Sequence, residues 1–357
     1  MHVLHVVGAR PNFMKAAPVL RELAGSLVMR QTLIHTGQHY DANMSHVFFR
    51  QLEIPEPDVN LGVGSGSHAQ QTAEIISRFE PVVSEYKPDL VLVYGDVNST
   101  MAAALVCSKL LVPIAHVEAG LRSRDRSMPE EINRLVTDQL ANLLFTPSPD
   151  ADENLLREGI DSKRIHFVGN VMIDTLVRLL PLADAHTGHD LPERYALVTL
   201  HRPSNVDDLP WLECMLLALS ELSHNLAVVF PVHPRTRQRI AGLGLQVLSN
   251  GRLRLLEPQP YLEFLALQCK AAVVITDSGG IQEETTFLGV PCLTVRENTE
   301  RPITVTRGTN LLVGRDIPRL QAETCRILAL EKKCPTAIPL WDGHAAERIA
   351  DVILRAI

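Results

Sequence analysis

The stretch ITDSGGIQEE, at 275–284, combines residue types that suit an anion lying beside hydroxyl groups. A short apolar run ends at Asp277 and is followed by Ser278, Gly279 and Gly280. Glycines let a phosphate approach backbone N–H groups, and the N-terminus of the helix expected next attracts the same charge. Glu284 is then placed to accept hydrogen bonds from two neighbouring hydroxyls, such as those of a ribose. The stretch therefore predicts a nucleotide site.

This stretch also has a purely structural interpretation. Glycines are common in any turn between a strand and a helix, and Glu283 and Glu284 suit the first turns of a helix, where the dipole favours acids. Two basic residues near the N-terminus, Arg10 and Lys15, could contact a phosphate from a second side, or could be a solvated surface pair. Their segment has neither the GxGxxG spacing nor the P-loop pattern, so neither a dinucleotide cradle nor an ATP cradle is indicated.

Three carboxylates are candidates for proton transfer. Asp96 and Glu118 each follow an apolar run, and Glu130 begins a helical pattern after Pro129. An unpaired carboxylate at the end of a buried strand is unfavourable, and several carboxylates in different surroundings are what proton transfer to and from carbon requires. Structural roles stay open for each: Asp96 as cap of the helix near Ser99, Glu118 paired with Arg122, and Glu130 paired with Arg134.

Apart from one histidine, the sequence gives no sign of a metal site, of paired cysteines or of a serine nucleophile. His201 ends an apolar run in the second half of the chain, where a ligand contact and a structural role are both open. The 14 histidines show no HExxH spacing, so we predict no metal site. The six cysteines are scattered without a CxxC pair, and no Gly-x-Ser-x-Gly motif occurs. We expect no cofactor.

Length and charge limit the class of protein. With 357 residues the chain is too long for one ordinary core, so two domains are expected. The net charge of -7 argues against a nucleic-acid-binding surface. No apolar run approaches the roughly 20 residues that a membrane-spanning helix needs, and the first residues lack a cationic region of the kind that starts a signal peptide. We therefore expect a cytoplasmic protein that does not bind membranes.

Short apolar runs alternate with helical patterns along the whole chain. Runs rich in Val, Ile and Leu are expected as strands at 2–8, 32–37, 90–95, 112–117, 143–146, 166–168, 196–201, 226–232, 253–256, 272–276, 292–295 and 311–313. Helical periodicity lies between most of them, for example at 14–23, 68–83, 100–110, 130–144 and 281–288. Because the expected strands are apolar on both faces, they are typical of buried parallel sheets. The alternation predicts a doubly wound α/β fold.

The expected domains are two Rossmann-like halves. Residues 1–170 would form the first and 171–343 the second, with a boundary near the polar, strand-free stretch at 182–193. The amphipathic segment at 344–357 would pack back on the first domain. In open α/β sheets ligands bind beyond the carboxyl ends of the strands, where the candidate residues lie. Two such edges facing each other would form an active-site cleft between the domains.

A series of motifs resembles one family, the non-hydrolysing UDP-N-acetylglucosamine 2-epimerases. The matching stretches run in family order from residue 8 to residue 314 and include GARPNFMKAAPV, TGQH, GDVNST, HVEAGLRS, PEEINR, VTLHRPSN, EPQPYLEFL, TDSGGIQEE and LGVPCLTVRENTERPITVTRGTN. The resemblance implies the two-domain glycosyltransferase-B architecture, a homodimer and a UDP-sugar substrate. It also implies interconversion of UDP-GlcNAc and UDP-ManNAc by inversion at C2, through elimination of UDP to 2-acetamidoglucal and re-addition.

The resemblance also implies roles for single residues. Asp96, Glu118 and Glu130 match the catalytic carboxylates, and His201 matches a histidine near the diphosphate. The positions that match substrate-binding residues are Arg10, Lys15, Ser278, Gly279, Gly280 and Arg301, with Glu284 as the ribose-binding acid and Gln259 and Phe264 around the uracil.

The chain departs from the family pattern at two places. Many members have a further arginine after the histidine and arginine that match His201 and Arg202, where this chain has Pro203. Some bacterial members carry a second, activating UDP-GlcNAc site that uses a Gln-His pair and a helix arginine; Gln38-His39 are present here, but 66–75 contains no arginine. Epimerases of related acetamido sugars, hydrolysing epimerases and retaining glycosyltransferases remain alternatives.

Overall fold

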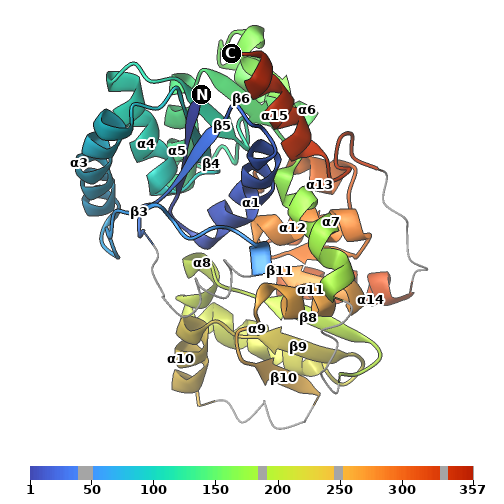
Figure 1. Ribbon diagram of the computed structural model, residues 1–357. Coiled ribbons are helices and arrows are strands. Elements are labelled where there is room, and N and C mark those ends of the chain that lie inside the picture. Colours follow the sequence, from blue (N-terminus) through green and yellow to red (C-terminus); the bar gives the residue numbers. More distant parts are fainter. Residues whose placement is uncertain (39–50, 184–190, 245–251, 330–336, 357) are drawn as a thin grey trace. The chain divides into compact units, whose positions relative to one another are not determined.

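The computed structural model describes residues 1–38, 51–183, 191–244, 252–329 and 337–356 (Figure 1). It divides into two compact units. Unit 1 comprises Met1–Arg178 together with Pro339–Ile357, and unit 2 comprises Leu179–Ile338. Each unit is built on its own parallel sheet and is described by itself below.

The sheet of unit 1 is parallel throughout and has seven strands in the order β3-β2-β1-β4-β5-β6-β7 within the described ranges. Its strands are β1 (His2–Val7), β2 (Arg30–His35), β3 (Val59–Asn60), β4 (Leu90–Tyr94), β5 (Ile114–Val117), β6 (Leu143–Thr146) and β7 (Ile165–Phe167). The central strand β4 reads LVLVY and is buried along its whole length. Both of its faces are covered, which is why its sequence is apolar without alternation.

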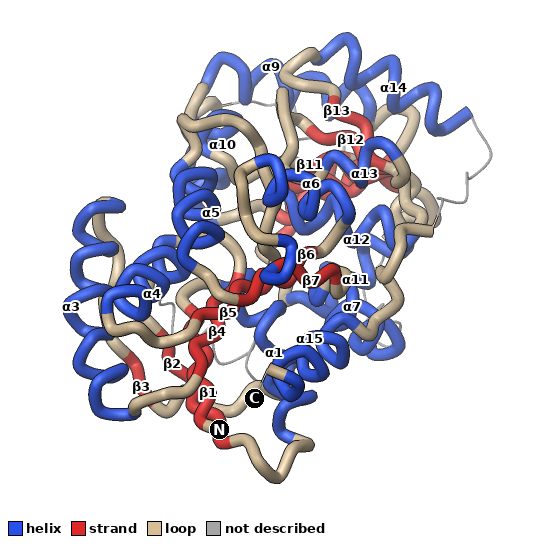
Figure 2. The backbone as a smooth tube through the Cα atoms, turned by 90° about the horizontal axis from the view of Figure 1, so that it is seen from above, coloured by secondary structure: helices blue, strands red, loops and turns tan. Residues whose placement is uncertain are grey.

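Helices cover both faces of this sheet (Figure 2). They are α1 (Arg10–Ala24), α3 (His68–Tyr86), α4 (Asn98–Lys109), α5 (Pro129–Leu140), α6 (Pro149–Arg157), α7 (Val171–Ala183) and α15 (Ala345–Arg355), with a 3-10 turn at Ser162–Arg164. Helices α3, α4 and α5 lie on one face, where Phe79, Ala103 and Cys107 pack with strand residues such as Val91. Helices α1 and α15 lie together on the other face.

Unit 2 repeats the same plan with a parallel sheet of six strands in the order β10-β9-β8-β11-β12-β13, counted over its described residues. The strands are β8 (Tyr195–Thr199), β9 (Ala227–Pro231), β10 (Leu253–Leu256), β11 (Val273–Thr276), β12 (Cys292–Thr294) and β13 (Asn310–Leu312). The helices are α8 (Pro203–Val206), α9 (Leu209–Leu222), α10 (Pro234–Gly242), α11 (Tyr261–Lys270), α12 (Gly279–Leu288), α13 (Pro302–Thr306) and α14 (Ile317–Ala329). One core contains residues of α9, α10 and α14, and another contains residues of α11 and α12.

Both strand orders are those of a Rossmann-like sheet, so the predicted doubly wound α/β fold is confirmed. Some element boundaries differ from expectation. Helix α1 begins at Arg10, a turn before the expected residue 14, because Pro11 suits the first turn of a helix. Helix α12 begins at Gly279 and therefore includes both glycines. Within the described ranges, no helix is long and apolar enough to cross a membrane.

Helix α15 is attached to unit 1 through its N-terminus. Its N-cap residue, His344, makes no capping hydrogen bond with its side chain. The cap comes instead from Asp174 on α7, whose carboxylate accepts hydrogen bonds from the N–H groups of Ala345 at 3.1 Å and Ala346 at 2.7 Å. The apolar face of α15, including Ile349 and Ile353, is buried. A side chain 171 residues earlier in the chain thus satisfies the first N–H groups of this helix.

We expect Asp174→Ala to lower the free energy of unfolding of unit 1 by about 1 kcal/mol, because it removes the cap of α15. Equilibrium unfolding in urea, followed by circular dichroism, measures this change. Glu347→Ala is the matched control on the same helix, since Glu347 is exposed and its ion pair among the described residues is with the exposed His344. Equal stability of the two variants would contradict a capping role for Asp174.

Candidate functional site

In unit 1, the ends of two neighbouring strands bring the first candidate acids to one edge of the sheet. Strands β4 and β5 pair in parallel, with Tyr94 opposite Val117. The N–H of Gly95 donates to the carbonyl of Val117 at 2.9 Å, so the chain turns away from both strands at the same level. Asp96 and Glu118 are the next residues of these two turns. Their carboxylates therefore lie at the carboxyl edge, where ligands of such sheets bind.

Asp96 is fixed by helix α5. Nη2 of Arg134 lies 2.6 Å from Oδ2 of Asp96, and the side-chain amide of Asn133 donates to the Asp96 carbonyl at 2.8 Å. Helix α4 begins at Asn98, and its N-cap residue, Val97, provides no side-chain cap. The alternative that Asp96 caps this helix is therefore wrong, and its partner is an arginine.

Glu118 is buried and forms an ion pair with Lys15 of α1. Nζ of Lys15 lies 2.8 Å from Oε1 of Glu118, and both side chains are at most 5% exposed. Gly95 has a φ of 62°, and a Cβ at this position would lie 2.6 Å from Nζ of Lys15. A glycine is thus needed both for the turn and for the approach of the lysine. Lys15 is not a surface cation, and the solvated-pair alternative is wrong for it.

The backbone of Glu118 is in an unfavourable conformation. Its φ is 72°, in the left-handed region that residues with a Cβ rarely adopt. Such strain costs of order 1–3 kcal/mol and is concentrated at functional sites. The proposed pairing of Glu118 with Arg122 is not what the structure shows, because Arg122 binds Asp138 and Glu158.

Glu130 and Glu131 are adjacent on α5 but have opposite surroundings. Glu131 is buried and accepts hydrogen bonds from the backbone N–H groups of Ser123 and Arg124, and it pairs with Arg134 at 2.6 Å. Glu130 is half-buried, and no hydrogen bond or ion pair joins its side chain to another described residue. The structural alternative, in which Glu130 pairs with Arg134, is therefore wrong. Glu131 is a structural acid, while Glu130 is available for a ligand.

The loop before α1 is tied to the same edge. The side-chain oxygen of Asn12 accepts hydrogen bonds from the N–H groups of Gly8 and Ala9, and its amide donates to the carbonyl of Tyr94 at 2.7 Å. Arg10 is the first residue of α1 and is half-buried. Asn12 thus places Arg10 near the turn that follows β4. His39 of the Gln38-His39 pair lies outside the described residues.

In unit 2, the predicted anion turn is the first turn of α12. Ser278 is the N-cap residue, and Gly279 and Gly280 begin the helix. A Cβ at Gly279 would collide with Nη1 of Arg301, so the glycine lets this guanidinium approach the N-terminus of the helix. Arg301 is buried and pairs with Glu283 at 2.8 Å and with Glu300 at 2.5 Å. A helix N-terminus beside a buried guanidinium is suited to a diphosphate.

His201, which follows β8, is oriented by Asp277 at the end of β11. Nδ1 of His201 lies 2.8 Å from Oδ1 of Asp277, while the histidine side chain is 49% exposed. Asp277 also accepts hydrogen bonds from the backbone N–H of Arg202 and the amide of Asn205. Burial alone would raise the pKa of Asp277, but His201 and these donors lower it below its usual value. The ionised Asp277 therefore binds Nδ1 of His201 and leaves Nε2 for a ligand.

Glu284 lies in the second turn of α12, so the interpretation of Glu283 and Glu284 as acids of the first turn is wrong. Its carboxylate accepts hydrogen bonds from the hydroxyl of Tyr261 at 2.9 Å and the amide of Gln268 at 3.2 Å. Burial raises the pKa of Glu284 to about 7, although both hydrogen bonds act in the opposite direction. Each carboxylate oxygen keeps a free lone pair for a further donor.

The remaining two candidates, Gln259 and Phe264, belong to helix α11 and the residues just before it. Phe264 is on α11 and packs with Ile281 of α12 in the same core. Gln259 precedes α11 and is half-buried, with its amide donating to the carbonyl of Glu257. Phe264 thus lies on the helix that provides two hydrogen-bond partners of Glu284, and Gln259 lies just before that helix in the chain.

Comparison with known proteins identifies the family of the chain. A sequence profile described as UDP-N-acetylglucosamine 2-epimerase matches residues 21–354, which is nearly the whole chain. The chain belongs to the UDP-N-acetylglucosamine 2-epimerase family. The predictions of this family and of an enzyme of the epimerase class are thereby confirmed.

Relatives of this epimerase cover its full length. The UDP-N-acetylglucosamine 2-epimerase of Methanocaldococcus jannaschii is 42% identical over 359 residues, covering 98% of this chain and 97% of that protein. The UDP-2,3-diacetamido-2,3-dideoxy-D-glucuronate 2-epimerase of Pseudomonas aeruginosa is 43% identical over 361 residues, covering 99% of this chain and 100% of that protein. A crystal structure of the M. jannaschii enzyme in complex with UDP-GlcNAc and UDP matches with a TM-score of 0.91 at 40% identity, covering 99% and 100% of the two chains. These matches also confirm the two-domain α/β fold.

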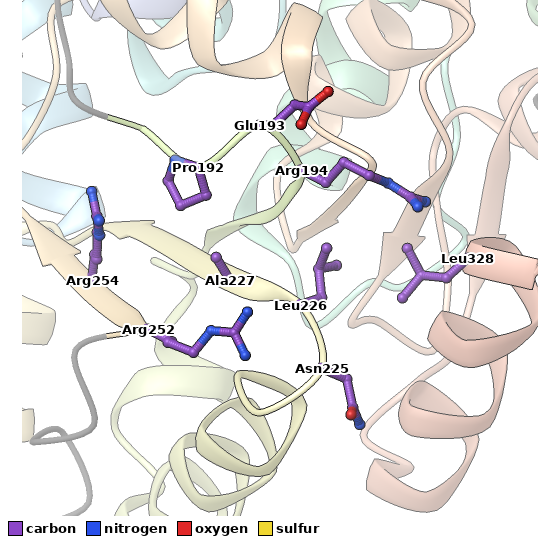
Figure 3. A pocket seen from close by; sticks show the side chains of 9 residues that line it. All are labelled: Pro192, Glu193, Arg194, Asn225, Leu226, Ala227, Arg252, Arg254 and Leu328. Carbon is purple, nitrogen blue, oxygen red and sulfur yellow. The ribbon is translucent and has the colours of Figure 1, made fainter.

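A pocket of about 540 Å³ in unit 2 of the epimerase lies away from the candidate residues. Figure 3 shows its nine lining side chains, among them Arg194, Arg252 and Arg254. Arg194 immediately precedes β8, and Arg252 and Arg254 lie at the start of β10. The pocket is therefore at the amino edge of the sheet, opposite the edge that carries His201 and Glu284. We assign it no part in the epimerase reaction.

Several residues around the candidate site were not among the site residues predicted from the sequence of this epimerase. They are Glu131, Asn133 and Arg134 in unit 1 and Tyr261, Gln268 and Asp277 in unit 2. The position of Asp277, directly after an apolar strand, carried the same signal that selected Asp96 and Glu118. The partners of Glu284 carried no such signal, because Tyr261 and Gln268 lie on α11 and meet Glu284 only through packing.

Proposed function

We propose that this epimerase inverts C2 of a UDP-acetamido sugar, interconverting UDP-GlcNAc and UDP-ManNAc without releasing the free sugar. The observation that carries the proposal is the likeness, over the whole chain, to the M. jannaschii enzyme crystallised with UDP-GlcNAc and UDP. The carboxylates at the edge of unit 1 and the anion turn of unit 2 support it, since the reaction needs both.

The proposed reaction proceeds by elimination and re-addition of UDP. The C2–H bond is not next to a carbonyl group, so its proton is not acidic in the resting substrate. As the bond between C1 and the UDP oxygen breaks, positive charge develops at C1 and makes the C2 proton labile. A carboxylate removes this proton to give 2-acetamidoglucal, and proton return to the opposite face with re-addition of UDP gives the epimer. The enzyme must stabilise the departing diphosphate and exclude water from the intermediate.

We assign nucleotide binding to unit 2. Ser278, Gly279 and Gly280 would bind the diphosphate through the N-terminus of α12, with His201 and Arg301 nearby. Glu284 would accept both ribose hydroxyls, and Gln259 and Phe264 would contact the uracil. That the ligand bridges the two units stays a prediction.

We assign proton transfer to unit 1. Asp96, Glu118 and Glu130 would provide the general acid and base groups, while Arg10 and Lys15 would supply positive charge close to the diphosphate. No cofactor and no metal enters this reaction. We also propose that the enzyme is a homodimer and that it is cytoplasmic.

A second candidate is the same inversion on a diacetamido uronic sugar. It is favoured by the P. aeruginosa relative, whose identity of 43% is as high as that of the M. jannaschii enzyme. The nucleotide-binding residues would be shared, and the sugar substituents at C3 and C6 would decide between the two substrates. Turnover of purified enzyme with each UDP-sugar, compared as kcat/KM, separates the candidates.

Incubation with UDP-GlcNAc in heavy water, without any acceptor, tests the proposed reaction. We expect deuterium at C2 of both UDP-GlcNAc and UDP-ManNAc, because the proton removed at C2 exchanges with solvent before it returns. Proton NMR and mass spectrometry measure the incorporation. Free ManNAc with UDP would identify a hydrolysing epimerase instead. An unlabelled UDP-GlcNAc pool would exclude the elimination, as expected for a glycosyltransferase or a binding protein.

A further inference from the structure

The imidazole of His116 on β5 is buried between two oxygen atoms. Its Nδ1 lies 2.6 Å from Oδ1 of Asp138 on α5, and its Nε2 lies 2.8 Å from the carbonyl oxygen of Gly95. A carbonyl oxygen accepts hydrogen bonds and cannot donate them. The Nε2 atom must therefore carry a proton. Nδ1 must also carry a proton when Asp138 is ionised, because a carboxylate can only accept a hydrogen bond.

Asp138 is surrounded by donors. Its side chain is fully buried, and Oδ2 accepts hydrogen bonds from the N–H of Gly120 at 3.1 Å and from Nη1 of Arg122 at 2.7 Å. Burial alone would raise the pKa of Asp138, but the charges and hydrogen bonds of His116 and Arg122 lower it below its usual value. An ionised Asp138 makes His116 a donor at both nitrogens, which is the imidazolium form.

The pair joins the two turns that carry candidate acids of unit 1. Gly95, whose carbonyl binds Nε2 of His116, immediately precedes Asp96. Gly120, whose N–H binds Asp138, lies two residues after Glu118. Glu118 is the residue with a φ of 72°, so its turn needs contacts that offset the strain. The hydrogen bond to Gly120 is one such contact.

We propose that the buried ion pair of His116 and Asp138 is a positioning device that fixes the turns bearing Asp96 and Glu118 relative to each other. The inference rests on the proposed function, in which those two acids transfer protons. His116 itself contacts neither the substrate nor a reacting atom. Its charged ring binds the Gly95 carbonyl on one side and Asp138 on the other. Removing the ring therefore alters the spacing of Asp96 and Glu118.

Another histidine of the same sheet provides a matched control. His5 on β1 is as deeply buried as His116, and its Nδ1 lies 2.7 Å from the hydroxyl of Tyr94. Burial lowers the pKa of His5 to about 3, so it is neutral. No described carboxylate contacts it. Replacing either histidine by glutamine removes a buried ring from the same sheet, but only His116→Gln removes a charge from the acid-bearing turns.

The test compares His116→Gln with His5→Gln by steady-state kinetics and thermal unfolding. For His116→Gln we expect kcat to fall by about tenfold or more while KM for UDP-GlcNAc changes by less than about threefold, because nucleotide binding is assigned to unit 2. For His5→Gln we expect a comparable loss of stability and a kcat within about twofold of wild type. Equal kcat values for the two variants would overturn the positioning role.

The charge of His116 is measured independently of activity. In wild-type enzyme labelled with ¹⁵N-histidine, both ring nitrogens of His116 are expected to carry protons, because each faces an acceptor oxygen, whereas His5 carries one. The signals are assigned by comparison with the spectra of His5→Gln and Asp138→Asn. Asp138→Asn also breaks the ion pair, so it replaces His116→Gln in the test if that variant does not fold. A neutral His116 would overturn the inference even in an active epimerase. Absence of C2 exchange in wild type would instead refute the proposed function and leave the measured charge unaffected.

Discussion

Replacing Glu130 by glutamine is expected to lower kcat by about 10²–10⁴-fold, the usual weight of an acid–base group, while UDP affinity and stability stay near wild type. The reason lies in its surroundings. Glu130 is half-buried in the first turn of α5, and its side chain has no hydrogen-bond or ion-pair partner within the described part of the chain. The amide therefore removes a titratable group without breaking a contact. Epimerisation followed by NMR, UDP titration by calorimetry and thermal unfolding measure the three quantities.

The neighbouring acid is the matched control for this prediction. Glu131→Gln should destabilise the protein, because Glu131 is buried and accepts hydrogen bonds from two backbone N–H groups and from Arg134. Loss of charged hydrogen bonds of this kind costs about 1–3 kcal/mol. Near-normal turnover in Glu130→Gln would remove Glu130 from the mechanism. Asp96→Asn and Glu118→Gln should also lose activity. Each of them also breaks an ion pair, so its effect on turnover is harder to separate from its effect on stability.

Replacing Glu284 by alanine is expected to weaken UDP binding by about 10–100-fold, because two ribose hydroxyls lose a charged acceptor. The same residue predicts a pH dependence. Burial raises the pKa of Glu284 to about 7, and only the ionised form accepts from both hydroxyls. The protonated fraction falls as the pH rises through 7, so affinity should increase by up to about tenfold between about pH 6 and pH 8. Calorimetry with UDP-GlcNAc measures the trend without interference from a terminal phosphate.

Glu284→Gln isolates this effect, because the amide keeps an oxygen acceptor but does not titrate. We expect the variant to bind UDP-GlcNAc more weakly than wild type above neutral pH. Its affinity should stay constant over the pH range in which the affinity of wild type increases. The other residues of the site are the same in both proteins, so their contributions cancel in the comparison. An identical pH profile in the two proteins would show that Glu284 does not bind the ribose.

The alternation of apolar runs and helical patterns was sufficient to predict both parallel sheets, because strands buried on two faces are apolar throughout. Strand β3 was not predicted, since Val59–Asn60 is too short to show a pattern. The strand expected at 143–146 is found with those bounds, but the helix expected at 130–144 ends at Leu140, so only the end of that helix was misplaced.

The candidate acids were visible because each follows an apolar strand or begins a helix. Their partners were not. Lys15 and Glu118 are 103 residues apart in sequence, and Arg134 and Asp96 are 38 apart, so only the sheet and its helices bring them together. The nearer partners, Arg122 for Glu118 and Arg134 for Glu130, were plausible by spacing and wrong. Spacing along one element reports local pairs, whereas these ion pairs form between elements.

The C-terminal helix α15 has a consequence for biosynthesis. It packs on α1 in unit 1 and is capped by Asp174, although all of unit 2 lies between Asp174 and this helix in the chain. Unit 1 therefore lacks one of its surface helices until the ribosome has finished unit 2. During translation the side of α1 that α15 will cover stays uncovered, so a nascent chain stalled within unit 2 should be bound by chaperones there.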